Sequence, residues 1–322
     1  MLRKGIGIDI GTTQISISSA EGGLLLKDLS VAAIDLDTEK VVEAGAAAVR
    51  YYKEFPDKVS LCWPVWDTVV KQMDVLCEIF RIFLRRALGH TAFKPVVMAS
   101  IPSDLTEAQT GAVEDALLFA GAHSVHFLEA PLCAALGVGF DFSVPMGQMI
   151  IHVGASRTEV AVVFLGDMVT YITEPVGGNK FDEAIVSYLE TKYRLHIGKR
   201  TAEQIKMRIA VIAEHDEPKT LDVKGRCLDT NEQRVVTLSS KEMLGALREP
   251  LARVLDTIIS VVERTDDEMR ADIARGGMVL TGGGILPGMD QFLADIMDLR
   301  TCVATNAETA AVEGAARALS KI

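Results

Sequence analysis

The sequence predicts a duplicated α/β fold with two lobes, and three glycine-containing turns are the main reason. The turns lie within residues 8–14, 151–159 and 280–288, and each follows an apolar run typical of a buried strand. Short strands and then helices follow both the first and the second turn, so one plan of elements occurs twice. The first two turns therefore mark equivalent points in two related halves.

The length of the chain also favours two lobes, because 322 residues exceed what one hydrophobic core usually supports. We expect the first lobe over residues 1–145, with a smaller subdomain at about 36–90. We expect the second lobe over residues 146–322, with a smaller subdomain at about 182–245. A polar, turn-rich segment at residues 216–236 predicts a surface hairpin within that subdomain.

The first half should contain strands that alternate with helices, which implies a largely parallel sheet covered by helices. Apolar residues at helical spacing predict one long helix over residues 69–88, and Thr106 is the expected cap of a helix that runs to residue 120. The other expected elements are strands at residues 6–10, 15–19, 24–27, 95–100 and 125–128 and helices at residues 43–52 and 130–137.

The second half should repeat this order. The expected elements are strands at residues 149–153, 160–164, 168–174 and 277–280 and helices at residues 182–193, 201–213, 241–263 and 290–297.

Composition excludes several classes of function. A net charge of -11 argues against nucleic-acid binding, which needs clustered Lys and Arg. The five cysteines are scattered without metal-ligand spacing, which favours reduced thiols and a cytoplasmic protein. No apolar run approaches the ~20 residues that span a bilayer, and no signal peptide precedes the first strand. We therefore expect a soluble protein, with a peripheral membrane contact left open as an alternative.

The first and last turns have the chemistry of phosphate and nucleotide binding. Asp9 closes a strand before Gly11-Thr12-Thr13, where backbone N–H groups and hydroxyls can cradle phosphate and the carboxylate can hold hydrated Mg²⁺. A plain hairpin turn is the alternative, and for this motif alone it is favoured. Residues 282–284 are three glycines between a buried strand and a helix, which lets a backbone approach a flat ligand.

With these motifs in place, the chain resembles the actin, DnaK-type chaperone and sugar-kinase superfamily, and most of all the bacterial MreB family. The resemblance is carried by Met-Leu-Arg-Lys-Gly-Ile-Gly-Ile-Asp-Ile-Gly-Thr at residues 1–12, by residues 193–206 and by residues 275–284. It covers nearly the whole chain and is weakest at residues 36–90. It implies an actin-like (ribonuclease H-like) fold that binds ATP or ADP in a cleft between its lobes. It also implies subunits that stack into antiparallel double filaments on the inner membrane face.

The resemblance also implies roles for particular residues. These are Asp9, Gly11, Thr12 and Thr13 in a first phosphate turn, Gly154, Ser156 and Arg157 in a second, Gly177, Gly178 and Asp182 near ribose and phosphates, Glu203 and Lys206 around adenosine, and Gly282, Gly283 and Gly284 in an adenosine turn. For Glu203 and Lys206, one helical turn apart, a solvated ion pair is the alternative.

The second turn departs from the family pattern, in which Asp-Ile-Gly-Gly-Gly-Thr-Thr-Glu stands where this chain has residues 152–159. His152 replaces a carboxylate that organises Mg²⁺, and imidazole is a poor magnesium ligand, so Asp9 would be the remaining weak metal contact. Ala155 and Ser156 replace glycines, which restricts close backbone approach and positive φ. Arg157 adds a guanidinium that can contact phosphate directly.

A second departure concerns hydrolysis. In the family a Glu-Glu-Pro sequence supplies the glutamate that positions water, whereas this chain has Glu129-Ala130-Pro131. Ala130 occupies the position of that glutamate, and Glu129 should point elsewhere because adjacent side chains face different directions. We therefore expect weak or absent hydrolysis and assign no catalytic residue.

Membrane contact, as in MreB proteins, would depend here on Phe93 in a short loop, since the chain lacks an N-terminal amphipathic helix. One exposed Phe contributes about 2 kcal/mol of burial, so filament avidity would be needed. A Phe packed under the sheet is the alternative reading.

The sequence thus favours an MreB-like filament subunit that binds nucleotide, associates with itself and serves cell shape. One alternative is a regulatory paralogue that co-assembles with, or caps, another MreB. A second is a small-molecule kinase of the same fold, which His152 and Ala130 count against. A chaperone of the DnaK type lacks support because no peptide-binding domain follows residue 322.

Overall fold

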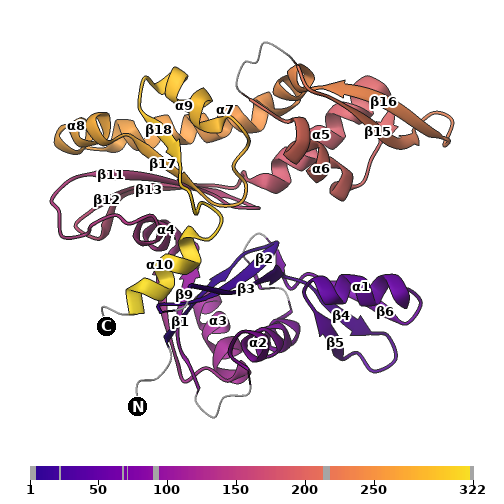
Figure 1. The fold of residues 1–322 in the computed structure, drawn as a ribbon, viewed down its shortest axis with the longest axis horizontal. Coiled ribbons are helices and arrows are strands. Elements are labelled where there is room, and N and C mark those ends of the chain that lie inside the picture. The colour runs from indigo at the N-terminus through magenta and orange to yellow at the C-terminus, as the bar shows by residue number, and fades with distance from the viewer. Residues whose placement is uncertain are drawn as a thin grey trace. The chain divides into compact units, whose positions relative to one another are not determined.

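The structure of the protein is a computed structural model, and it describes residues 5–21, 23–66, 69–70, 72–89, 94–212 and 218–319. The chain divides into two compact units (Figure 1). Unit 1 comprises Met1–Val144, Leu165–Asp167 and Asn306–Ile322, and unit 2 comprises Pro145–Phe164 and Met168–Thr305. The last segment of the chain therefore groups with the first half, and the lobe and subdomain limits expected from the sequence stay predictions.

Unit 1 is built on a five-stranded sheet in the order β10-β9-β1-β2-β3. The strands are β1 (Gly5–Ile10), β2 (Gln14–Ser19), β3 (Gly23–Leu29), β9 (Val96–Ile101) and β10 (Ser124–Glu129). Strands β1, β2 and β3 form an antiparallel meander, and β1, β9 and β10 run parallel. Apolar side chains of β1, β2 and β9 pack with helices α2 (Met73–Leu88) and α3 (Glu107–Ala120) into one core.

Three smaller groups of elements complete the described part of unit 1. They are the sheet of β4 (Ala32–Asp35), β5 (Val41–Ala44) and β6 (Val59–Cys62) with helix α1 (Ala46–Glu54), the pair β7 (Val65–Trp66) and β8 (Val69–Val70), and the helices α4 (Ala130–Gly137) and α10 (Ala310–Ala318). The expected helix over residues 69–88 begins only at Met73, because its β-branched start pairs as a strand. Thr106 caps α3 as expected, through a capping box with Gln109.

Unit 2 repeats the sheet of unit 1 strand for strand, in the order β13-β12-β11-β17-β18. The strands are β11 (Gln148–Val153), β12 (Thr158–Phe164), β13 (Asp167–Glu174), β17 (Met278–Thr281) and β18 (Thr301–Val303). The first three follow one another in the chain, β11 pairs antiparallel with β12, and β17 and β18 add in parallel beside β11, as β9 and β10 do beside β1. The predicted duplication is confirmed.

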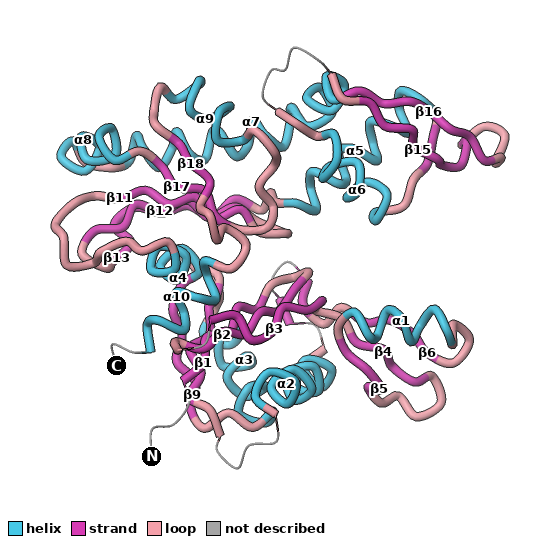
Figure 2. Tube along the Cα trace, viewed as in Figure 1, coloured by secondary structure: helices cyan, strands magenta, loops and turns pink. Residues whose placement is uncertain are grey.

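The remaining elements of unit 2 are mostly helical (Figure 2). They are α5 (Gly178–Tyr193), β14 (Leu195–His196), α6 (Lys199–Ile209), the hairpin β15 (Thr220–Cys227) and β16 (Gln233–Ser239), α7 (Ser240–Arg264), α8 (Asp267–Gly276) and α9 (Met289–Met297). The expected surface hairpin is therefore present. Helices α8 and α10 were not predicted from the sequence.

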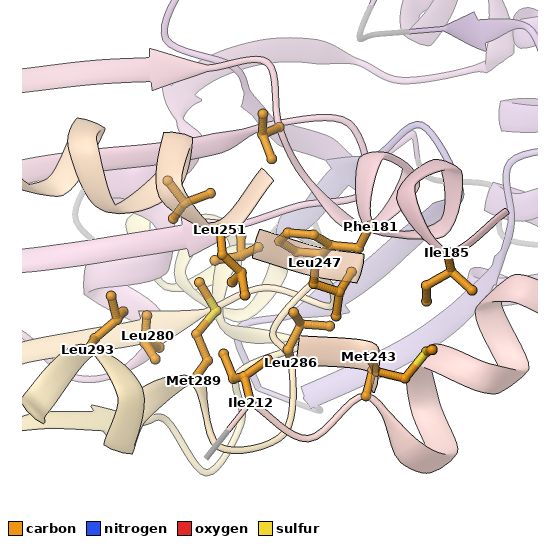
Figure 3. Packing of buried hydrophobic residues seen from close by; sticks show 14 of the residues in the cluster. Phe181, Ile185, Ile212, Met243, Leu247, Leu251, Leu280, Leu286, Met289 and Leu293 are labelled. Carbon is orange, nitrogen blue, oxygen red and sulfur yellow. The ribbon is translucent and has the colours of Figure 1, made fainter. Parts of the chain in front are cut away.

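The core of unit 2 fixes the elements that carry the glycine turns (Figure 3). Phe181 on α5, Leu247 and Leu251 on α7, and Leu280 on β17 belong to one buried cluster with Leu286, which follows the last turn. Each such side chain contributes about 1.5–3 kcal/mol by leaving water. The start of α5 and the end of β17 are thereby held on a common apolar layer.

Helices α4 and α10 cross in backbone contact within unit 1. A Cβ built on Gly137 would lie 1.8 Å from the Ala310 carbonyl oxygen, and one on Gly314 would lie 1.7 Å from that of Cys133. The Arg317 guanidinium donates to the carbonyls of Leu136 and Gly137 at 3.0 and 2.9 Å, so it caps the end of α4. This crossing explains why the C-terminal segment belongs to unit 1.

Candidate functional site

The second phosphate turn, residues 154–157, connects β11 to β12 and also caps helix α5. The Gly154 N–H donates to the Arg157 carbonyl at 2.8 Å, which closes the turn. The N–H groups of Gly178 and Asn179 donate to the carbonyls of Gly154 and Ala155 at 3.0 and 2.7 Å. The first amides of α5 are thus bonded to the turn, which fixes the turn to the helix.

The turn does not use the left-handed backbone that its missing glycines suggested. Neither Ala155 nor Ser156 has a positive φ, which agrees with the restriction expected at these two residues. Close approach is instead concentrated at Gly177, where a Cβ would lie 2.5 Å from the Gly154 carbonyl oxygen. The substitutions in the turn are therefore sterically compatible with its fold.

The last turn packs directly against the second one. Gly282 has a φ of 96°, and a Cβ on it would lie 2.1 Å from the Val153 carbonyl oxygen. The Gly284 N–H donates to that same carbonyl at 2.9 Å, and a Cβ on Gly284 would lie 2.3 Å from the Gly154 carbonyl oxygen. A Cβ on exposed Gly283 would meet no atom within 4 Å. Two of the three glycines are packing residues, and Gly283 is the one that faces open space.

Lys206 of α6 contacts the start of α5, which is bonded to the second turn. Its Nζ donates to the Gly178 carbonyl at 2.9 Å, lies 2.8 Å from Asp182 Oδ1, and would be 3.3 Å from a Cβ on Gly178. Lys206 is only 6% exposed, so it is not the solvated ion-pair partner of Glu203, which is exposed. Burial raises the pKa of Asp182, and the Lys206 ammonium offsets part of that rise.

The first phosphate turn lies in unit 1, at the end of β1. Asp9 is in register with Ser16 on β2 and Ser100 on β9, at the carboxyl end of the parallel pair. The Gly11 N–H donates to the Gln14 carbonyl at 2.9 Å, and a Cβ on Gly11 would lie 2.7 Å from that oxygen. Gly11 has no positive φ, so close backbone contact, and not a left-handed conformation, requires glycine there.

Thr12 and Thr13 complete this turn in different ways. The Thr12 side chain is buried, and the Thr13 carbonyl accepts from the Ser30 N–H at 2.9 Å. The turn is thereby tied to the chain that follows β3. Structurally it is the counterpart of the turn between β11 and β12 in unit 2.

His152, where the family resemblance leads us to expect a metal-organising carboxylate, contacts its neighbour on β17. Its Nδ1 lies 3.1 Å from Thr281 Oγ1, and the two residues are in register on parallel strands. Glu159, opposite His152 on β12, is 3% exposed and has an interaction of its own. Because Mg²⁺ takes oxygen ligands, the imidazole of His152 does not fit a magnesium site at the second turn. The contact of Thr281 with His152 was not predicted from the sequence, in which only the glycines that follow Thr281 form a recognisable motif.

Ala130 begins helix α4 directly after β10 and is 6% exposed. Glu129 is the N-cap residue of α4 and pairs in the sheet with Ile101, while Pro131 occupies the first turn. A methyl group therefore stands where the family pattern would place a carboxylate.

Phe93, the predicted membrane contact, lies outside the described residues. Among the described residues, no helix is both long and apolar enough to cross a membrane.

These features define an actin-like protein: two α/β units with matching sheets and a glycine-containing turn after the first strand of each. Solved structures agree with this fold. MreB5 of Spiroplasma citri bound to AMPPNP matches with a TM-score of 0.92 and 26% identity, covering 100% of this chain and 98% of that one. The MamK double helical filament matches with a TM-score of 0.81 and 15% identity over 100% of both chains, which bears on the fold alone.

The chain belongs to the MreB/Mbl protein family, whose model matches residues 3–322. It is 34% identical over 311 residues to the cell shape-determining protein Mbl of Bacillus subtilis, covering 95% of this chain and 92% of Mbl. It is 32% identical over 329 residues to the cell shape-determining protein MreB of Escherichia coli, covering 100% and 95%. The resemblance inferred from the sequence motifs is confirmed.

Proposed function

We propose that this chain is a cytoskeletal filament subunit that binds ATP or ADP and serves cell shape. The observation that carries the proposal is the convergence in unit 2 of two turns, the start of α5 and the buried Lys206. Family membership supports it, since the relatives are cell shape-determining proteins. The similar MreB5 structures of Spiroplasma citri are bound to AMPPNP and to ADP.

Within this function we assign the following nucleotide contacts. The exposed backbone of Gly283 suits the approach of a flat base, and Lys206 beside Gly178 suits the polar part of the nucleotide. Arg157 and Ser156 in the second turn and Asp9, Thr12 and Thr13 in the first are the further assigned contacts, as the family resemblance implies. Glu203, exposed on α6, is assigned to the adenosine.

We further propose that hydrolysis is weak or lost. Ala130 offers no proton acceptor at the start of α4, and a general base contributes roughly 10²–10⁴-fold to such reactions. Self-association into filaments, contact with the inner membrane face through Phe93 and a cytoplasmic location follow from the family resemblance and complete the proposal.

Two other functions make different predictions. A regulatory paralogue would co-sediment with another MreB without forming filaments alone. A small-molecule kinase of this fold needs a catalytic carboxylate, and Ala130 and His152 count against it.

The test is a sedimentation assay with ATP, ADP or no nucleotide, with phosphate release measured in parallel. We expect assembly with either nucleotide and little phosphate release. The double variant His152→Asp and Ala130→Glu should release phosphate faster than the parent, and an unchanged rate would refute the hydrolysis argument. A chain that neither pellets nor binds nucleotide would refute the filament function.

A further inference from the structure

His152 and Thr281 connect the two turns of unit 2 side chain to side chain. His152 lies two residues before Gly154 on β11, and Thr281 immediately precedes Gly282 on β17. Their strands are parallel neighbours, and His152 Nδ1 lies 3.1 Å from Thr281 Oγ1. This contact therefore lies next to the point where both turns leave the sheet, beside the backbone bond from the Gly284 N–H to the Val153 carbonyl.

The hydrogen bonds of Thr281 determine what the imidazole can do. The Thr281 hydroxyl is fully buried and donates its one proton to the Ile151 carbonyl at 3.4 Å. It can then only accept from His152, so Nδ1 carries the proton and is committed to this bond. An imidazole fixed in this way is a positioning group for the turns, and it offers no oxygen to a hard cation.

In place of a metal ion, positively charged side chains of the protein lie near the second turn. Lys206 Nζ lies against the Gly178 carbonyl, where a Cβ on Gly178 would be 3.3 Å away. Arg157 belongs to the turn itself and is half-buried. Lys206 Nζ also lies 2.8 Å from Asp182 Oδ1, so this carboxylate balances part of its charge. An ammonium and a guanidinium with limited exposure form strong charge-assisted hydrogen bonds with phosphate oxygens.

We propose that His152 is a positioning residue that ties the phosphate turn to the glycine turn through Thr281, and that this chain consequently binds adenine nucleotide without magnesium. The proposal rests on the proposed function, because it concerns how the same nucleotide is held. The two are tested by different measurements. This proposal is tested by how nucleotide binding depends on a divalent cation, and the proposed function is tested by assembly and hydrolysis.

The experiment is calorimetric titration of the full chain with ADP, and separately with AMPPNP, in EDTA and in magnesium chloride. We expect the two dissociation constants for each nucleotide to agree within about twofold. His152→Asp supplies a carboxylate and removes the Nδ1–H donor, so its affinity should fall in EDTA and recover by about tenfold or more with magnesium. His152→Asn keeps an N–H donor toward Thr281, so its binding should stay independent of magnesium.

Two further variants separate positioning from charge. Thr281→Val removes the hydroxyl but keeps the shape of the side chain, and should weaken ADP binding about two- to tenfold both with and without magnesium. His126→Asp makes the same change of residue type at an exposed position on β10 of unit 1 and should bind like the parent. If Thr281→Val fails to fold, the comparison of His152→Asp with His152→Asn still decides.

Three results would overturn the inference. Binding that requires magnesium in the parent chain would show that other oxygens hold the cation. Nucleotide binding that occurs with manganese or zinc but is absent in EDTA would indicate that His152 is a metal ligand. Absence of nucleotide binding under every condition would refute the proposed function itself, and so is distinguishable from the other two.

Discussion

Replacing Gly314 with alanine should loosen unit 1 at the crossing of α4 and α10. The added Cβ would lie 1.7 Å from the Cys133 carbonyl oxygen, half the 3.4 Å at which ordinary contact begins. The obstacle is backbone, so no side-chain rotation relieves it and the helices must separate. Overpacking typically costs about 1–3 kcal/mol. Separation would also weaken the bonds from Arg317 and Asn306 to the Gly137 carbonyl, each contributing about 1 kcal/mol. We therefore expect a loss of about 3–4 kcal/mol.

Tryptophan fluorescence during urea unfolding measures this loss in the right unit. Both tryptophans of the chain, Trp63 and Trp66, belong to unit 1. With a slope of about 2 kcal/mol per molar urea, the midpoint should fall by roughly 1.5–2 M. The matched control is Gly111→Ala on α3, where a Cβ meets no atom within 4 Å and helix propensity favours alanine by up to ~1 kcal/mol. Equal midpoints for the two variants would refute the reasoning from backbone contact.

Four further substitutions have defined outcomes. Burial raises the pKa of Glu242, but hydrogen bonds from Lys192, Tyr193 and Ser239 lower it to about 2. The ionised Glu242 therefore stabilises unit 2 above about pH 4.5, and this contribution is lost as the pH falls toward 2. Glu242→Gln should reduce the loss of stability at acid pH, measured by circular-dichroism unfolding, and an unchanged pH dependence would contradict the assignment. Thr106→Ala should cost about 1 kcal/mol in the fluorescence assay by removing the cap of α3, whereas a neutral result would show that the cap is dispensable. Gly282→Ala should lower the stability of unit 2 by about 2 kcal/mol or more, because it has a positive φ and a backbone oxygen 2.1 Å from the new Cβ. Gly283→Ala should leave stability unchanged but weaken ADP binding in calorimetry. A loss of stability in Gly283→Ala, together with weaker ADP binding only in Gly282→Ala, would contradict the roles assigned to the two glycines.

The strands of both sheets could be predicted from sequence because their signal is local. Apolar runs that end in glycine turns specify β1, β2, β11 and β12 to within about one or two residues, since alternation and turn chemistry act over short distances. Thr106 likewise predicts the start of α3, because a cap needs only its own turn. The boundary of α2 was less accurate, because strand pairing between β7 and β8 competes with helical periodicity.

The site was predictable as a set of motifs but not as an arrangement. The sequence indicated glycines at residues 282–284, yet only their packing separates Gly282 and Gly284, which contact the neighbouring turn, from the open Gly283. Ala155 and Ser156 have no positive φ, as expected for residues that replace glycines, but only the structure shows that the close backbone approach beside this turn lies at Gly177. Thr281 has no recognisable pattern in one sequence, since its role depends on a strand 129 residues away.

The sequence by itself determined the duplicated α/β plan and the family, and it predicted the substitutions at His152 and Ala130, because these are properties of residue identity and short-range order. Only the tertiary structure decided which residues meet: His152 with Thr281, Lys206 with Asp182, and α4 with α10. These contacts depend on the register of parallel strands and on helices that touch at glycines. Strand register and helix contact both arise from the packing of segments that are far apart in the chain. For that reason the C-terminal helix belongs to the first unit, although the sequence order had placed it in the second lobe.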